Sequence, residues 1–167
     1  MGPGSRVFSV GMDKQDEKVD QMSGIVVGID GSAHSRWALE WAMKEAAIRR
    51  TTLTVITVHE ISVGYWGSGL TYPEDHAVAE HARQSAQTEV DKVLADLGEP
   101  RPESVTVQSV SGTPAEAILE AAKDADMIVV GSRGAGGFTY LLMGSVSTRV
   151  AHRAHCPVVV IPAEHHN

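Results

Sequence analysis

The sequence contains a single cysteine and no long apolar run, and both shortages limit what the protein can be. Cys156 alone excludes an internal disulfide and is typical of a reducing compartment, so we expect a cytoplasmic protein. No stretch of 18 apolar residues occurs, so the sequence predicts no membrane-spanning helix and no membrane partner.

Basic residues are also scarce. The chain has 14 Lys and Arg against 21 Asp and Glu, a formal charge of −7, which argues against nucleic acid as a partner because backbone phosphates require a basic face. Asp and Glu are nevertheless absent from Met127 to Ala163, where Arg133, Arg149 and Arg153 occur. Such a local positive region suits a small anion better than a polyanion.

A length of 167 residues is enough for one domain with a buried core. The first residues, Met1–Ser5, resemble a cloning scar, and Asp13–Asp20 is mostly charged. We therefore expect a flexible tail at 1–21, one folded domain at 22–163 and a short tail at 164–167.

Strand-like and helix-like segments alternate from Gly24 onward, which predicts an α/β fold with a five-stranded parallel sheet and helices on both faces. The predicted strands are Ile25–Ile29, Leu53–His59, Ser104–Val110, Met127–Val130 and Val158–Ile161. The predicted helices are Ala33–Arg50, His76–Leu97, Pro114 to about Asp124, and Gly144–Ala154, with a long loop at Glu60–Asp75.

Turn and capping residues support these boundaries. Gly98 stands where a helix C-cap is expected, and Thr113-Pro114-Ala115-Glu116 predicts a helix start with a capping box. Parallel sheets bind ligands outside the carboxyl ends of their strands. The loops after Ile29, Val58, Val110 and Val130 are therefore expected to form the site.

The segment from Gly131 to Ser147 is rich in glycine and follows the fourth strand directly. Glycines let phosphate oxygens approach the backbone and permit a positive φ. The amides of Ser145, Val146 and Ser147 open the next helix and lack partners within it, while two of these residues add hydroxyl donors. The segment therefore predicts a phosphate-binding cradle.

Two familiar phosphate motifs are absent from this segment and from the first strand. No Gly-Lys-Ser/Thr follows the glycines, so it is not a Walker loop, and no Gly-x-Gly-x-x-Gly follows Ile25–Ile29. Without that lysine or an obvious general base, binding is better supported than phosphoryl transfer.

The spacing Gly131-x2-Gly134-x9-Gly144-Ser145 resembles the nucleotide motif of the universal stress proteins that bind ATP. The first strand with Gly28–Ser32 and the ending Ala154–Pro162 also resemble this family, and the likeness extends from Ser23 to Ala163. It implies a Rossmann-like fold with strand order 3-2-1-4-5 and a stress-response regulator that binds ATP with Mg²⁺. It also implies a homodimer that pairs Val158–Ile161 with its twin.

The resemblance further implies a set of residues that contact the nucleotide. Asp30 lies near the nucleoside, Gly28 offers backbone to the sugar or base, and the main chain of Val58 contacts the adenine edge. Val130 and Gly131 line the adenosine side. The phosphate-contacting set is Arg133, Gly134, Gly144, Ser145, Val146 and Ser147.

Other functions stay open. The chain is alternatively a slow ATPase or an autophosphorylating enzyme with Ser145 or Ser147 as acceptor, a cyclic-AMP-binding protein, or an interaction module without nucleotide. Asp30 or Ser32 can simply cap a helix, and Arg133 is as compatible with a solvated loop as with a phosphate contact.

Several residues that carry chemistry elsewhere are expected to be structural. Trp37 and Trp41 share a helical face and are expected in the core, and Cys156 is expected to pack rather than react. The eight histidines show no spacing typical of a metal site, and no Ser-His-Asp arrangement is evident.

Overall fold

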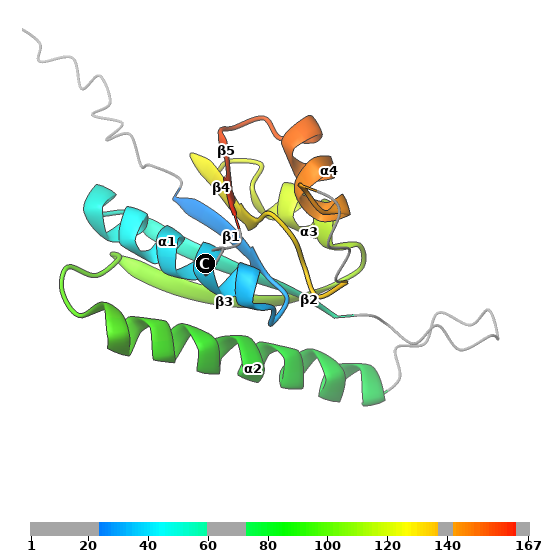
Figure 1. Ribbon diagram of the computed structural model, residues 1–167. Helices are drawn as coiled ribbons and strands as arrows, with labels where there is room; N and C mark the ends of the chain where they lie inside the picture. The colour runs from blue at the N-terminus through cyan, green and yellow to red at the C-terminus, as the bar shows by residue number, and fades with distance from the viewer. Residues whose placement is uncertain (1–23, 60–72, 137–141, 163–167) are drawn as a thin grey trace, which may run out of the picture.

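The computed structural model describes residues 24–59, 73–136 and 142–162 (Figure 1). The tails expected at 1–21 and 164–167, most of the loop expected at 60–75, and Gly137 lie outside the described residues.

The described strands form one parallel sheet in the order β3-β2-β1-β4-β5, which confirms the predicted fold and topology. Its strands are β1 (Ile25–Ile29), β2 (Thr52–His59), β3 (Ser104–Ser111), β4 (Met127–Gly131) and β5 (Val158–Ile161). The helices between them are α1 (Ala33–Arg49), α2 (Pro73–Leu97), α3 (Pro114–Ala121) and α4 (Ser145–Arg153).

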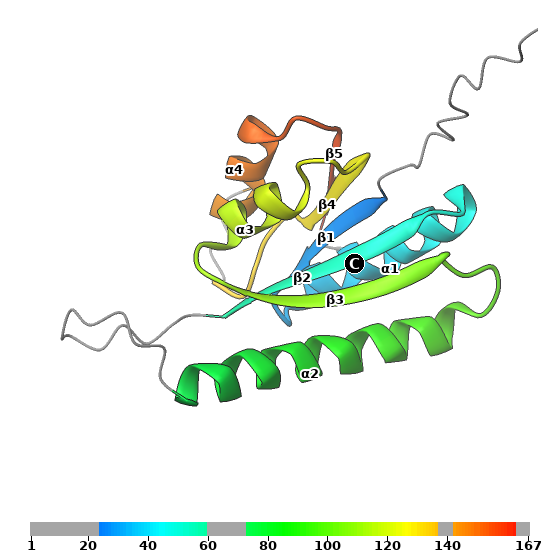
Figure 2. The ribbon, with the colours of Figure 1, turned by 180° about the vertical axis from the view of Figure 1, so that it is seen from behind.

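Helices cover both faces of the sheet, α1 and α2 on one face and α3 and α4 on the other (Figures 1 and 2). Alternate strand residues serve two separate cores: Val27 and Val55 pack beneath α1 and α2, whereas Val26 and Ile56 pack beneath α3 and α4. Trp41 packs against the first core, as expected. The apolar character of the inner strands is explained by this double cover.

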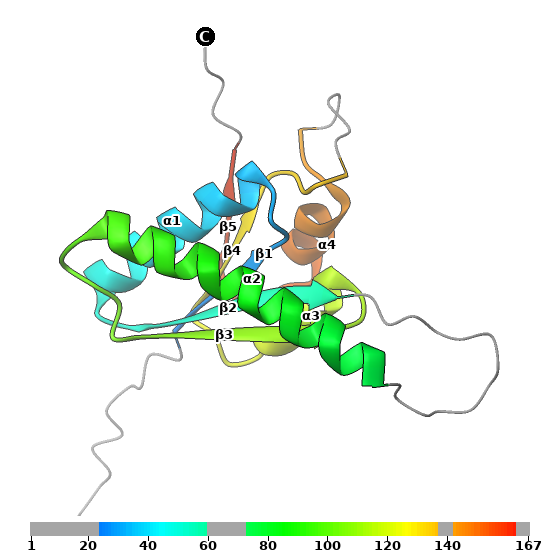
Figure 3. The same cartoon turned by 90° about the horizontal axis from the view of Figure 1, so that it is seen from below.

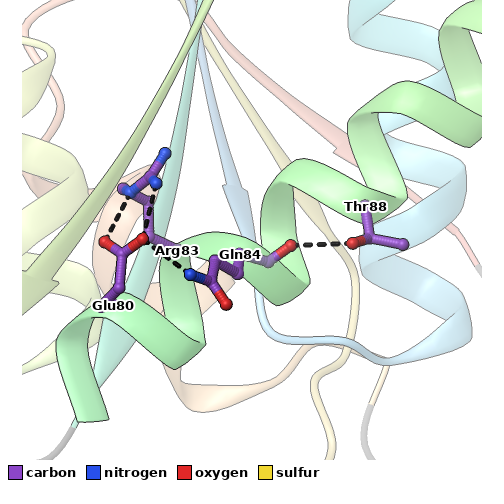
Figure 4. A network of polar contacts seen from close by, with 4 residues as sticks. All are labelled: Glu80, Arg83, Gln84 and Thr88. Atoms are coloured by element: carbon purple, nitrogen blue, oxygen red, sulfur yellow. Dashed lines mark hydrogen bonds and ion pairs between the residues drawn. The ribbon is translucent and has the colours of Figure 1, made fainter. Parts of the chain in front are cut away.

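The amino-terminal part of α2 extends past the ends of the strands (Figures 1 and 3). From His76 onward, where burial is described, Ala86 is the first residue of this helix buried in the core. Before it, Glu80 accepts hydrogen bonds from Arg83 Nη2 at 2.7 Å and from Gln84 Nε2 at 2.9 Å (Figure 4). The hydrogen bonds from the Arg83 guanidinium and from Gln84 lower the pKa of Glu80 to about 2. Local polar contacts thus support these turns where the core does not.

The start of α2 differs from the prediction. Pro73 begins the helix, so Pro73–Asp75 is helical where the sequence analysis expected a loop. Proline is favoured in the first turn because its missing N–H has no intrahelical partner there, and acidic residues in that turn suit the helix dipole. At the other end Gly98 has a φ of +70°, which agrees with the predicted cap.

The capping box expected at the start of α3 is absent. Thr113 occupies the N-cap position but makes no side-chain capping bond, although Pro114 does open the helix. Glu116 pairs instead with Arg153, and with Arg149 at 3.9 Å, which joins α3 to α4. The helix also ends at Ala121 rather than near Asp124. A better electrostatic partner from a distant helix has replaced the local contact.

None of the helices within the described ranges is both long enough and apolar enough to cross a membrane.

Two residues of α1 offer a matched test of this packing. Leu39 is fully buried in the first core, whereas Ile48 is 72% exposed. We expect Leu39→Ala to lower the free energy of unfolding by about 2–5 kcal/mol, because it leaves a cavity. Ile48→Ala should change it by no more than about 0.5 kcal/mol. Urea unfolding of both variants measures the difference, and equal losses would contradict the described core.

Candidate functional site

The turn from β1 into α1 is fixed by short-range hydrogen bonds. Ser32 caps α1 by accepting the Ser35 N–H at 3.2 Å. The buried Ser35 hydroxyl donates to the Ser32 carbonyl at 3.0 Å and accepts the Asp30 N–H at 3.3 Å. Ser32 therefore performs the capping considered for both residues, which leaves the Asp30 carboxylate available for other contacts.

Ser132 connects the end of β4 to the start of α4. Its N–H donates to the Ile161 carbonyl at 2.7 Å, and its own carbonyl accepts the Gly144 N–H at 2.7 Å and the Ser147 hydroxyl at 3.1 Å. The residue is 6% exposed. These bonds hold the first turn of α4 beside the glycine-rich segment. Sequence analysis missed Ser132 because its contribution is made by backbone atoms.

A cavity of about 530 Å³ opens at the carboxyl ends of β1, β2 and β4. It lies where the strand order reverses between β1 and β4, the position at which open parallel sheets bind ligands. Segments following β1, β3 and β4 line it together with the end of β2. Its size is in the range of small-molecule sites.

All the residues that the resemblance placed in a nucleotide site line this one cavity. They are Gly28, Asp30, Val58, Val130, Gly131, Arg133, Gly134, Gly144, Ser145, Val146 and Ser147. The lining also includes residues outside the set that the resemblance implied: Ile29, Ser35, Ile56, Pro114, Ile118, Ala135 and Gly136.

Two of the missed residues had a sequence signal. Ile56 stands two positions before Val58 and so shares its face of β2. Pro114 follows the loop after β3, which had been expected to matter. Ile118 lies one helical turn farther along α3 and is reached only by knowing how that helix packs.

None of the motif glycines has the positive φ that the sequence analysis had considered, and only Gly131 and Gly134 lie where a side chain would be too close to another described atom. Among the described glycines, positive φ occurs at Gly24, Gly31, Gly98 and Gly112 but at none of those that line the cavity. A Cβ on Gly131 would lie 2.9 Å from the His34 carbonyl oxygen, so that glycine permits close packing of β4 on α1. A Cβ on Gly144 would be no closer than 3.5 Å to the described residues beyond its chain neighbours.

The start of α4 presents backbone amides to the cavity. Gly144 is the N-cap, and the Thr148 N–H donates to its carbonyl at 3.0 Å. The three amides between them belong to the first turn, where no intrahelical acceptor exists. The sequence analysis considered the Ser147 hydroxyl as a hydrogen-bond donor to phosphate or as an acceptor in autophosphorylation. It is instead buried and donates to the carbonyls of Ser132 and Gly144. Ser145 is exposed.

Asp30 places a carboxylate on the cavity wall. Its Oδ1 accepts the Ser32 N–H at 3.0 Å and its Oδ2 accepts the Ala135 N–H at 2.8 Å. Burial raises the pKa of Asp30, but hydrogen bonds with Ser32, Ala135 and Ser35 lower it by more, so the net shift is downward. The stability from these bonds is present above about pH 4 and is lost as the pH falls through the folded-state pKa.

Other reactive groups lie away from the cavity. His59 and Ser109 share a hydrogen bond of 2.8 Å between β2 and β3, yet neither lines the cavity. Cys156 packs beside the second core, and burial together with the Asp126 charge raises the pKa of its thiol. Within the described ranges, no three His, Cys, Asp or Glu side chains gather closely enough to hold a metal ion.

Residues 22–162 match the sequence model of the universal stress protein family. A universal stress protein of Mycobacterium tuberculosis strain H37Rv is 36% identical over 149 residues, an alignment that covers 88% of this chain and 50% of the relative. The chain therefore spans about half the length of that curated relative.

Solved structures share the same fold. A universal stress protein from Lactobacillus plantarum is 23% identical with a TM-score of 0.67, and the match covers 84% of this chain and 98% of that one. A universal stress protein from Archaeoglobus fulgidus in complex with dAMP is 26% identical with a TM-score of 0.55, again covering 84% and 98%.

Gly131, which precedes Ser132, and Gly144, whose N–H donates to the Ser132 carbonyl, should respond differently to substitution by alanine. Gly131→Ala forces a Cβ against the backbone of α1 and should lower the free energy of unfolding by about 1–3 kcal/mol. Gly144→Ala meets only ordinary contacts and should cost less than about 1 kcal/mol, the scale of a helix-cap change. Chemical denaturation compares them, and a larger loss for Gly144→Ala would contradict the packing described above.

Proposed function

Because the chain belongs to the universal stress protein family, we propose that its cavity binds an adenine nucleotide, with ATP as the ligand, and that the protein acts as a nucleotide-dependent regulator of a stress response. The observation that carries the proposal is the division of one cavity into an apolar wall and a wall of backbone amides. A nucleotide has the same division, because its base is planar and weakly polar and its phosphates are anionic.

The apolar wall suits the adenosine half. Ile56, Val58, Ile118 and Val130 line this part of the cavity, and Gly28 lies between them on β1. A Cβ on Gly28 would meet Ile118 Cδ1 at 2.4 Å, so its absence lets that side chain pack against the strand and leaves room above it. Apolar side chains with a few placed polar groups are typical of cofactor sites.

The rest of the lining suits phosphates. The glycine-rich segment and the first turn of α4 form it with little more than backbone, and Arg133 adds a positive charge. Helix N-termini favour anions through their unpaired N–H groups and the helix dipole. The fold does not require glycine at 144, where φ is −78° and a Cβ would be tolerated. Room for a ligand accounts for the glycine at that position.

Mg²⁺ would be bound chiefly by the phosphates of the nucleotide. Mg²⁺ keeps several waters and commonly uses one or two carboxylates together with substrate phosphates. Asp30 is the carboxylate among the described lining residues, and the Ser35 and Ser145 side chains also line the cavity. The proposed ligand is therefore the Mg²⁺ complex of ATP.

Binding accounts for these residues better than turnover. No Lys or His occurs among the described residues that line the cavity. Asp30 is a poor general base because its pKa is lowered, and base catalysis works best with a pKa near the operating pH. Ligand linkage provides the regulation, since nucleotide stabilises whichever conformation holds it.

The proposal predicts saturable binding of ATP with Mg²⁺. Isothermal titration calorimetry should show heat at millimolar ATP or below, and the melting temperature should rise with ATP concentration. Cyclic AMP added as a competitor should displace ATP only weakly, because it carries one phosphate. The absence of both binding heat and a thermal shift would refute the proposal. Preferential binding of cyclic AMP would identify cyclic AMP, and not ATP, as the ligand.

A second prediction places the phosphates at α4. Gly144→Leu should weaken ATP binding by at least about ten-fold, the scale of losing good hydrogen bonds to a charged group. The matched control is Thr113→Leu, which changes the N-cap of α3 at a residue that makes no side-chain capping bond and does not line the cavity. If both variants fold and bind ATP as the unchanged protein does, the phosphates lie elsewhere.

We also propose a homodimer through β5. This strand is at the edge of the sheet, and its apolar residues Val158–Ile161 are all only partly buried. An apolar edge strand is a template for pairing with another chain. Sedimentation equilibrium at micromolar concentration should give twice the chain mass, and a monomer there would contradict the proposal.

A further inference from the structure

Asp30 joins two segments of the cavity that are far apart in the sequence. The Ala135 N–H donates to Asp30 Oδ2 at 2.8 Å, across 105 positions. The carboxylate follows β1 and the amide belongs to the glycine-rich segment that follows β4. Ser32 holds the other carboxylate oxygen, so the side chain is oriented from its own turn before it contacts the loop.

Gly134 lies directly against this contact. A Cβ at position 134 would be 2.5 Å from Asp30 Oδ2 and 3.7 Å from the Asp30 carboxyl carbon, and no other described residue beyond its chain neighbours would come within 4 Å. The φ of Gly134 is not in the positive region, so its backbone conformation is one that alanine adopts. The Asp30 carboxylate therefore explains why this position has no side chain.

We propose that Asp30 is a positioning residue that fastens the glycine-rich loop to the cavity wall through the Ala135 amide, and that Gly134 is the glycine this contact requires. The effect on ligand affinity rests on the proposed function, whereas the contact itself needs no ligand. A fastened loop holds its backbone near the geometry that phosphates need, so less ordering accompanies binding.

The charge of Asp30 supports this role over contact with phosphates. An ionised carboxylate repels a phosphate at short range, and its lowered pKa keeps it ionised at neutral pH. Its carboxylate oxygens accept the backbone N–H of Ser32 in the turn and of Ala135 in the loop. The carboxylate therefore orders the backbone of the turn and of the glycine-rich segment.

The contact can be tested in the ligand-free protein. The exchange rate of the Ala135 amide proton, measured by NMR, should rise at least about ten-fold in Asp30→Ala, because a hydrogen bond to a charged acceptor is lost. Asp124→Ala, which removes an exposed carboxylate ahead of β4, is the control and should leave that rate unchanged. An unchanged rate in Asp30→Ala overturns the proposal.

A double-mutant cycle tests the link with Gly134. Gly134→Ala should displace the Asp30 carboxylate and weaken ATP binding roughly ten-fold, and Asp30→Ala should do the same. Because both changes break one contact, the double variant should be no weaker than Asp30→Ala. Losses that multiply instead would show independent roles and overturn the proposal. Melting temperatures establish that each variant is folded.

Comparison of ATP with adenosine separates positioning from direct contact. If Asp30 acts through the loop, Asp30→Ala should weaken ATP binding more than adenosine binding in NMR titrations. Equal losses would assign Asp30 to the nucleoside and overturn the positioning role. Failure of the unchanged protein to bind ATP would refute the proposed function, while the exchange result would still decide whether Asp30 holds the loop.

Discussion

The backbone of Ser132 is the contact on which the cavity depends. Its carbonyl accepts the Gly144 N–H at the start of α4, and its N–H donates to the Ile161 carbonyl of the edge strand β5. The Ser147 hydroxyl adds a third bond from one turn into the helix. All three form around a residue that is almost fully buried, where an unpaired polar group is costly. The amides of α4 can face the carboxyl ends of the strands only because this link fixes where the helix begins.

The sheet and its site were predictable because they depend on periodicity and topology. Alternating strands and helices specify parallel pairing, and parallel pairing places the carboxyl ends of β1 and β4 side by side. Residues 30 and 134 therefore meet although their positions in the sequence are distant. The resemblance then named the individual residues, and the structure brings each of them to the same cavity.

Side-chain partners were less predictable because they depend on neighbours that the sequence does not reveal. Glu116 was expected to cap its own helix, but α4 brings two arginines within reach. The Ser147 hydroxyl was expected to face a ligand, but it donates hydrogen bonds to two backbone carbonyls instead. The glycines illustrate the same limit. A side chain at Gly131 would be too close to a carbonyl oxygen of α1, and one at Gly134 would be too close to the Asp30 carboxylate. Neither reason can be read from the spacing of the motif.

The joining of α3 to α4 by Glu116 has a consequence for how these two helices respond to their surroundings. Ile118, on the apolar wall, and the amides of Ser145 and Val146 belong to helices that are linked at the surface by exposed ion pairs. Exposed pairs are weak and are screened by salt. Rising ionic strength therefore weakens this link between the two helices, while the apolar residues that both helices bury in the second core continue to hold them on the sheet.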